Sequence, residues 1–154
     1  MKPIRNAVKC LVIENEKIVI TKYLKGMKEG YYDIPGGKIE EWETAEEAAI
    51  REMKEETGIK VSNLIKKGSF EVEYPDRIFY FEIFIAKNYQ GILQDFEENT
   101  AEWIEICELL NKEKILSNIL LLKKPYNEFL YNEKLEVKIK VKVDEEENVL
   151  NIEY

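Results

Sequence analysis

The chain contains the segment Gly36-Gly37-Lys38-Ile39-Glu40-Glu41-Trp42-Glu43-Thr44-Ala45-Glu46-Glu47-Ala48-Ala49-Ile50-Arg51-Glu52-Met53-Lys54-Glu55-Glu56-Thr57-Gly58-Ile59, which holds most of its recognisable chemistry. Thr44 and Glu47 form a capping box, in which the hydroxyl and the carboxylate each satisfy a backbone N–H of the first helical turn. Gly58 can adopt the left-handed conformation that ends a helix. The sequence therefore predicts a loop followed by one short helix over about residues 45–57.

Three carboxylates lie on one face of this expected helix. Spacings of three and four residues return to the same side, so Glu52, Glu55 and Glu56 fall within an arc of about 100°. No Lys or Arg lies within that arc, and like charges at this spacing repel. Oxygen ligands of this kind suit Mg²⁺, although a solvated acidic face is an alternative in a chain with 31 Asp and Glu among 154 residues.

The same segment resembles the signature of the Nudix hydrolases. In that signature a glycine and a glutamate precede an arginine-glutamate pair, which is followed by an apolar residue, two more glutamates, a glycine and a second apolar residue. The matching residues are Gly37, Glu43, Arg51, Glu52, Met53, Glu55, Glu56, Gly58 and Ile59. Nine fixed positions over 23 residues are a specific signal, and they favour a metal site over a merely acidic surface.

The resemblance implies an enzyme that hydrolyses a nucleoside diphosphate linked to another group, with Mg²⁺ or Mn²⁺ as cofactor. It assigns the metal ligands Gly36 (through its carbonyl), Glu52, Glu55 and Glu56, the catalytic Arg51 with the same three glutamates, and the structural Gly37, Glu43 and Gly58. It also implies that Glu43 pairs with Arg51. A bound metal can lower the pKa of water and a carboxylate can take its proton, but the resemblance leaves open which glutamate is that base.

The resemblance covers about residues 4–124 and extends to MutT-like members of the family, through Pro35-Gly36-Gly37-Lys38-Ile39-Glu40 and the turn Pro75-Asp76-Arg77. It implies an α/β Nudix fold, a mixed β-sheet sandwiched between α-helices. The expected substrate-binding residues are Lys22, Tyr23, Lys38, Arg77 and Asn118, and Glu98 and Glu102 are candidates for an extra carboxylate. The chain departs from the MutT-like pattern at Lys22 and Tyr23, where an arginine is typical, and at Trp42, where a glycine is common.

Composition limits the other classes of function. A chain of 154 residues is expected to form one domain, with residues 1–128 as the hydrolase core and 129–154 as an extension of it. The formal charge of −8 disfavours binding to a nucleic acid polymer, whereas a free nucleotide remains a suitable substrate. There is no histidine, and Cys10 and Cys107 are interpreted as two buried thiols. No apolar segment reaches membrane length, so we expect a cytoplasmic protein.

The remaining segments predict a mainly β structure. The expected strands are 4–13 and 17–21 as a hairpin, 31–34, 61–65, 68–74 and 77–86 as a hairpin around Pro75-Asp76, and 103–104, with helices over about 105–110 and 115–123. Strict alternation over 135–143 and again over 149–154 predicts a C-terminal β-hairpin outside the usual Nudix core. Its apolar face must be buried against the domain or a second subunit, so a homodimer is a candidate assembly.

The sequence therefore predicts a Mg²⁺-dependent pyrophosphohydrolase. The expected substrate is a purine deoxynucleoside triphosphate, oxidised forms included, cleaved to the monophosphate and pyrophosphate. The resemblance supports this reading, because Asn118 lies near the position where MutT-like relatives place a base-reading Asn, and an amide can read the edge of a purine. The alternatives are an ADP-ribose or nucleotide-sugar pyrophosphatase and a non-catalytic nucleotide-binding domain, while the acidic charge disfavours an mRNA-decapping enzyme.

Overall fold

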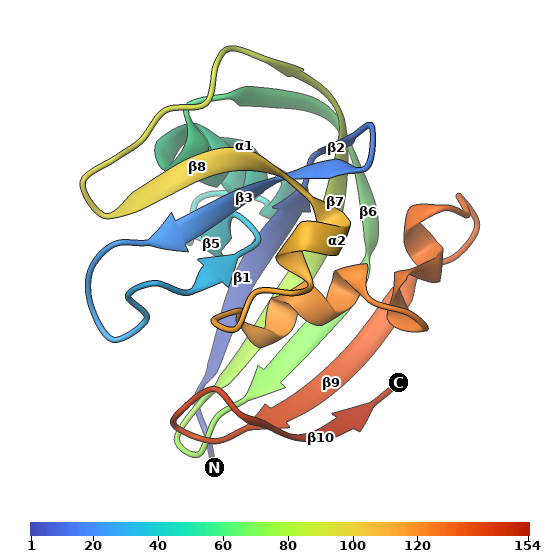
Figure 1. Ribbon diagram of the computed structural model, residues 1–154. Helices are drawn as coiled ribbons and strands as arrows, with labels where there is room; N and C mark the ends of the chain where they lie inside the picture. Colours follow the sequence, from blue (N-terminus) through green and yellow to red (C-terminus); the bar gives the residue numbers. More distant parts are fainter.

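The computed structural model describes residues 1–154 and is built on a six-stranded mixed sheet in the order β10-β9-β6-β7-β1-β5 (Figure 1). Its strands are β1 (Ile4–Leu11), β5 (Gly36–Lys38), β6 (Lys60–Glu73), β7 (Ile78–Gln90), β9 (Val137–Val143) and β10 (Val149–Glu153). β1 runs parallel to β7 and β9 runs parallel to β6, whereas the other neighbouring pairs are antiparallel. The predicted mixed sheet is confirmed.

β6 and β7 form the long hairpin predicted around Pro75 and Asp76. The two predicted segments before this turn are one strand, interrupted by a bulge between Lys66 and Gly68. Gly68 has φ of 124°, and a Cβ added to it would lie 1.9 Å from the carbonyl oxygen of Val137. Glycine is therefore required where β9 begins to pair with β6.

A smaller sheet crosses the large one. It contains β2 (Ile13–Glu14), β3 (Lys17–Tyr23), β4 (Tyr32–Asp33) and β8 (Asn99–Glu105). The predicted hairpin between 4–13 and 17–21 is wrong in its first strand, because the chain leaves the large sheet after Leu11 and only β2 pairs with β3. Asn15 and Glu16 both have positive φ, as a tight two-residue hairpin turn requires. β8 is longer than predicted because it pairs with β3 along its whole length.

α1 (Ala45–Thr57) is the one long helix, and it begins and ends as predicted. Thr44 and Glu47 form the capping box, and Gly58 has φ of 87°. The other helical elements are α2 (Ile106–Leu109) and the 3₁₀ helices η1 (Ser117–Leu122) and η2 (Tyr126–Leu130). The helix predicted over 115–123 is thus a 3₁₀ helix with five of its six residues buried. None of these helices has the length and apolar character needed to span a bilayer.

The two faces of the large sheet carry separate cores. α1 covers one face, where Ala49 and Met53 pack with Val8 and Phe84. The 3₁₀ helices cover the other face (Figure 1). On this face β9 contributes the buried residues Val137, Ile139, Val141 and Val143. The C-terminal hairpin therefore extends the sheet and buries its apolar face within its own chain. Of the two cysteines, Cys10 is buried as predicted, but Cys107 is exposed because it lies on the outer side of α2.

Candidate active site

Gly36 and Gly37 belong to β5, which pairs with β1. A Cβ on Gly36 would lie 1.9 Å from the carbonyl oxygen of Val8, so this glycine allows the two backbones to pair. A Cβ on Gly37 would lie 2.5 Å from the carboxyl carbon of Glu52. The expected loop is thus a short strand, and Gly37 makes room for a signature glutamate on α1.

Arg51 connects the signature carboxylates. Its guanidinium donates to Glu43 with N–O distances of 2.6 and 3.0 Å, which confirms the predicted pair. It also donates to Glu52 at 2.9 Å, to Glu55 at 3.1 Å and to the carbonyl of Lys38 at 2.9 Å. The expectation that no cation offsets the carboxylates of α1 is therefore wrong, because the side chain of Arg51 bends round to reach two of them.

Glu52, Glu55 and Glu56 line one cavity of about 530 Å³ at the end of α1. Its other lining residues are Tyr23, Phe96, Glu97, Glu98 and Asn99. Of the two candidates for an extra carboxylate, only Glu98 is brought here, since Glu102 is exposed on β8 opposite Ile20. The cavity has acidic walls and suits a ligand that brings positive charge with it.

The electrostatics of Glu56 suit a cation. Burial raises the pKa of Glu56 well above its ordinary value, and Glu52 and Asp33 raise it further, while the charge of Lys9 acts in the opposite direction. A divalent ion would remove this repulsion, and the oxygen-only donor set fits Mg²⁺ or Mn²⁺. The three carboxylates do not converge as a ready-made ligand cluster. In this arrangement Glu55 pairs with Arg51. Its side chain is 58 % exposed, so it has room to turn away from Arg51 toward a bound ion.

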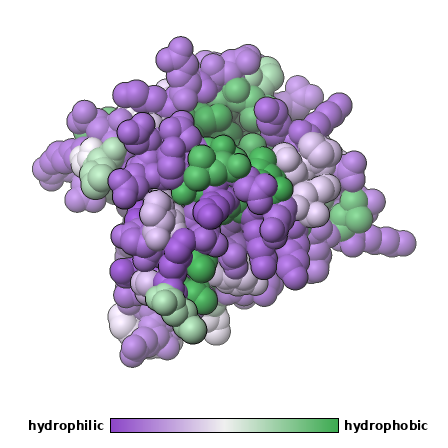
Figure 2. All heavy atoms as spheres, turned by 90° about the horizontal axis from the view of Figure 1, so that it is seen from below, coloured by the Kyte–Doolittle hydropathy of each residue, from purple (hydrophilic) through white to green (hydrophobic).

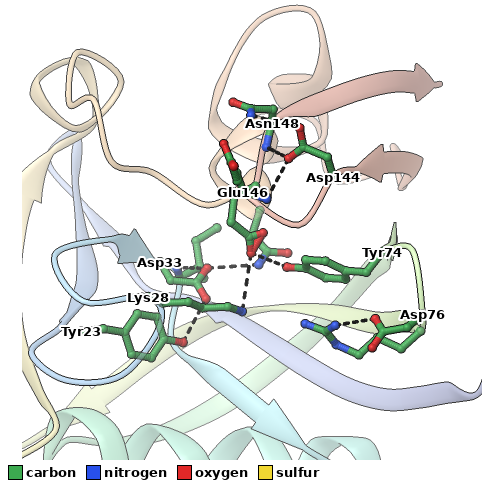
Figure 3. Close-up of polar contacts among 12 residues, drawn as sticks. Tyr23, Lys28, Asp33, Tyr74, Asp76, Asp144, Glu146 and Asn148 are labelled. Atoms are coloured by element: carbon green, nitrogen blue, oxygen red, sulfur yellow. Dashed lines mark hydrogen bonds and ion pairs between the residues drawn. The ribbon is translucent and has the colours of Figure 1, made fainter.

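A buried polar cluster centred on Asp33 (Figure 3) is linked to this cavity by Tyr23, which lines the cavity and bonds Asp33. The Asp33 carboxylate accepts from Lys9 at 2.8 Å, from Tyr23 at 3.3 Å, from Asn118 at 3.1 Å and from the backbone N–H of Ile34 at 2.8 Å. The Oδ1 atom of Asn118 is buried and has no hydrogen-bond partner. Because buried polar atoms are nearly always paired, this oxygen is free for a ligand.

Tyr23 joins the two parts of the site. Its ring lines the acidic cavity, and its hydroxyl donates to Asp33. The charge of Asp33 raises the pKa of the Tyr23 hydroxyl, with burial and the charge of Glu56 as further causes, so the hydroxyl stays protonated as a donor. A ligand with a charged end and a polar ring system can therefore span the cavity and the Asp33 cluster.

The other predicted substrate-binding residues lie at different places. Lys22 lies over the ring of Tyr32, and strand alternation puts it on the opposite face of β3 from Tyr23, so it is separate from the cavity. Lys38 is exposed, and its carbonyl is used by Arg51. Arg77 pairs with its neighbour in the β6–β7 turn and lies 4.2 Å from the centre of the Tyr74 ring.

Four residues of this region are not among the site residues predicted from the sequence: Lys9, Asp33, Tyr74 and Glu147. Lys9 carried a signal, because it is the one charge within the otherwise apolar run of residues 7–13, and its side chain is only 5 % exposed. Asp33 precedes the glycines but matches no part of the signature. Glu147 lies in the C-terminal hairpin, outside the resemblance, where one acidic turn residue cannot be told from its neighbours.

Comparisons with known proteins agree with this geometry. A model of the NUDIX domain matches residues 3–123. The 8-oxo-dGTP diphosphatase of Escherichia coli K12 is 32% identical over 110 residues, which are 71% of this chain and 85% of that protein. The ADP-ribose pyrophosphatase of Bacillus subtilis is 29% identical over 105 residues, 67% of this chain and 56% of that protein.

A solved structure extends the likeness to the whole chain. The crystal structure of a MutT protein from Bacillus halodurans superposes with a TM-score of 0.77 and 22% identity, covering 97% of this chain and 96% of that one. At that identity the likeness concerns the fold, and its coverage includes the C-terminal hairpin.

Proposed function

Because this chain belongs to the Nudix family and is a hydrolase of nucleoside diphosphate derivatives, we propose that its substrate is a purine deoxynucleoside triphosphate, oxidised purines included. The products are the nucleoside monophosphate and pyrophosphate. The observation that carries the proposal is the buried, unpartnered Oδ1 of Asn118. Asn118 is connected to the acidic cavity by hydrogen bonds, because both Asn118 and Tyr23, which lines the cavity, donate to Asp33. The curated relative named an 8-oxo-dGTP diphosphatase supports the same substrate class.

Asn118 is suited to read a base because its orientation is set. Its amide nitrogen donates to Asp33, so its oxygen is presented as an acceptor. A base that offers an N–H to this oxygen completes the pairing, and a base that offers another acceptor leaves two buried oxygens facing each other. Leaving a buried acceptor unpaired costs about 1–3 kcal/mol, which is enough to select among bases.

The family generally uses divalent metal ions, and in this chain Glu52, Glu55, Glu56 and the Gly36 carbonyl are proposed to hold Mg²⁺ or Mn²⁺. When bound, the ion supplies charge neutralisation for the diphosphate and acidifies water. Arg51 positions Glu52 and Glu55. A water oxygen forms a bond to one phosphorus of the α–β bridge as the bond to the bridging oxygen breaks, and a glutamate carboxylate takes the proton of the water.

The proposal is tested by a hydrolysis screen with Mg²⁺ over 8-oxo-dGTP, canonical deoxynucleoside triphosphates, ADP-ribose and nucleotide sugars. We expect Asn118→Ala to lower kcat/KM about tenfold or more for purine triphosphates, because about 1.4 kcal/mol corresponds to a factor of ten. Asn127→Ala is a matched control, since Asn127 bonds only the carbonyl of Leu122 in the neighbouring helix.

The main alternative is an ADP-ribose or nucleotide-sugar pyrophosphatase, which the Bacillus subtilis relative makes worth testing. Preferred turnover of ADP-ribose, or an equal loss on all substrates in Asn118→Ala, would shift the assignment to that class. The non-catalytic alternative is set aside, since all signature glutamates are present.

A homodimer stays a prediction with less support than the sequence suggested. The apolar face of β9 is covered by its own chain, so it does not need a second subunit. The face of the molecule in Figure 2 is mostly hydrophilic, with one apolar patch near its centre and single apolar side chains elsewhere. Light scattering on the intact chain measures its assembly directly. The cytoplasmic location also stays a prediction, which fractionation of cells would test.

A further inference from the structure

The turn of the C-terminal hairpin reaches the Asp33 side of the site (Figure 3). Asp144 organises this turn, because its carboxylate accepts from the backbone N–H groups of Glu146 and Asn148, both at 2.9 Å. Glu147 lies between them with φ of 68°, and its side chain is only 12 % exposed. The turn therefore directs the carboxylate of Glu147 inward, whereas that of Glu146 stays outside.

Glu147 contacts two side chains that lie beside the Asp33 cluster (Figure 3). Its Oε1 accepts from the hydroxyl of Tyr74 at 2.6 Å, and Lys28 lies 3.8 Å from the same atom. Burial raises the pKa of the Tyr74 hydroxyl, and both Glu147 and Asp33 raise it further, so the two carboxylates act on one hydroxyl from nearby. Glu147 also lines a cleft with Ser117, the residue before Asn118. The hairpin thus places a carboxylate next to the helix that carries the unpartnered amide oxygen.

We propose that Glu147 is a specificity-determining residue whose carboxylate accepts N–H groups from the edge of a guanine-type base. This inference rests on the proposed function, since it assigns a further contact to the purine site. Two acceptors near this turn have no donor within the chain, namely the Oδ1 of Asn118 and the second oxygen of Glu147, whereas the Asp33 carboxylate is already paired. They require a ligand edge that is rich in donors.

Guanine meets this requirement better than the other bases. Its Watson–Crick edge carries two adjacent donors, N1–H and the 2-amino group, and the one Glu147 oxygen that Tyr74 leaves free has two lone pairs to accept them. Oxidation at C8 leaves both donors in place. Adenine offers one amino donor beside a ring-nitrogen acceptor, which would face the carboxylate unfavourably. The same edge therefore selects guanine nucleotides, oxidised or not, against adenine nucleotides.

The contacts of Glu147 leave room for this role. Tyr74 holds one carboxylate oxygen and so fixes the direction of the side chain, while the other oxygen has no partner within the chain. The contact with Lys28 is long, and the lysine side chain is 35 % exposed. Such partly exposed ion pairs are weak, so an entering base can displace Lys28 without disturbing the Tyr74 hydrogen bond.

The test is a comparison of dGMP with dIMP, which lacks only the 2-amino group, by calorimetry without metal. We expect wild type to bind dGMP about tenfold more tightly, and Glu147→Gln to reduce this ratio to about one, because the amide replaces an acceptor with a donor. In Glu146→Gln, the matched control on the exposed side of the turn, the ratio stays at the wild-type value. The unfolding temperature of each variant is measured alongside.

Steady-state kinetics give a second measurement. With Mg²⁺ and dGTP, Glu147→Gln should raise KM about tenfold and leave kcat within about twofold, because the base contact is remote from the reacting phosphorus. Equal binding of dGMP and dIMP by wild type would overturn the inference, whether or not the variant folds. An unchanged dGMP-to-dIMP ratio in a folded Glu147→Gln would overturn it as well. A wild type that hydrolyses no purine triphosphate would instead refute the proposed function, and calorimetry would still decide the role of Glu147.

Discussion

Separate substitutions of Gly36 and Gly37 should distinguish an effect on stability from an effect on activity. In Gly37→Ala the new Cβ would lie 2.5 Å from the Glu52 carboxyl carbon, where contact normally requires about 3.5 Å. The carboxylate must therefore move by about 1 Å, which its flexible side chain permits. In Gly36→Ala the new Cβ would lie 1.9 Å from the backbone carbonyl oxygen of Val8, which can move only if β5 separates from β1.

The magnitudes follow from these contacts. Gly37→Ala gains about 0.4–1 kcal/mol by restricting the unfolded chain and loses about 1.5–3 kcal/mol if the Arg51–Glu52 hydrogen bond breaks. The net loss should be about 0.5–2.6 kcal/mol, which lowers the unfolding temperature by about 2–8 °C. Displacement of a catalytic group by about 1 Å should lower kcat/KM about 100-fold. Gly36→Ala should cost about 3 kcal/mol or more by overpacking, and lower the unfolding temperature by about 10 °C.

Thermal unfolding followed by circular dichroism and pyrophosphate release with Mg²⁺ give the two quantities for each variant. The two variants should separate, with Gly37→Ala folded but nearly inactive and Gly36→Ala unstable. Wild-type activity in Gly37→Ala would refute the placement of Glu52 in the reaction. A loss of stability in Gly37→Ala as large as that in Gly36→Ala would show that β5 does not pack as described.

Three further predictions concern the carboxylates and the hairpin. The double variant Glu55→Gln, Glu56→Gln should lose most of kcat in a pyrophosphate-release assay; no gain in stability is expected from Glu55, which already pairs with Arg51. Truncation after Asn132 removes four buried residues of β9, each contributing about 1.5–3 kcal/mol, so circular dichroism should show no cooperative unfolding; a stably folded fragment would contradict this. Hydrogen bonding to Arg51 lowers the pKa of Glu43, so its stabilisation is complete above the ordinary value of about 4.3 and is lost as the pH falls through the lowered pKa. Urea unfolding should therefore show Glu43→Gln less stable than wild type at pH 7, with the difference shrinking toward about pH 3; a pH-independent difference would contradict the linkage.

The sequence alone determined the helix at the centre of the site and the chemistry on it. The ends of this helix are set by Thr44, Glu47 and Gly58, which bond or position backbone groups within one turn of themselves. A few neighbouring residues are therefore enough to predict where the helix begins and ends. The signature likewise placed Glu43 against Arg51 across eight positions. Alternation over the C-terminal segment was sufficient to predict its strands, because period two is a local property of an extended chain.

Only the tertiary structure decided which distant residues share the site. Lys9, Asp33 and Asn118 meet because β1, β4 and η1 converge, and no local interaction signals that convergence. Tyr74 and Glu147 are 73 residues apart and meet only because Gly68 lets β9 pair with β6. A buried hydrogen bond depends on which groups lose their water together, and that is set by the packing of the strands rather than by the neighbours of either residue along the chain.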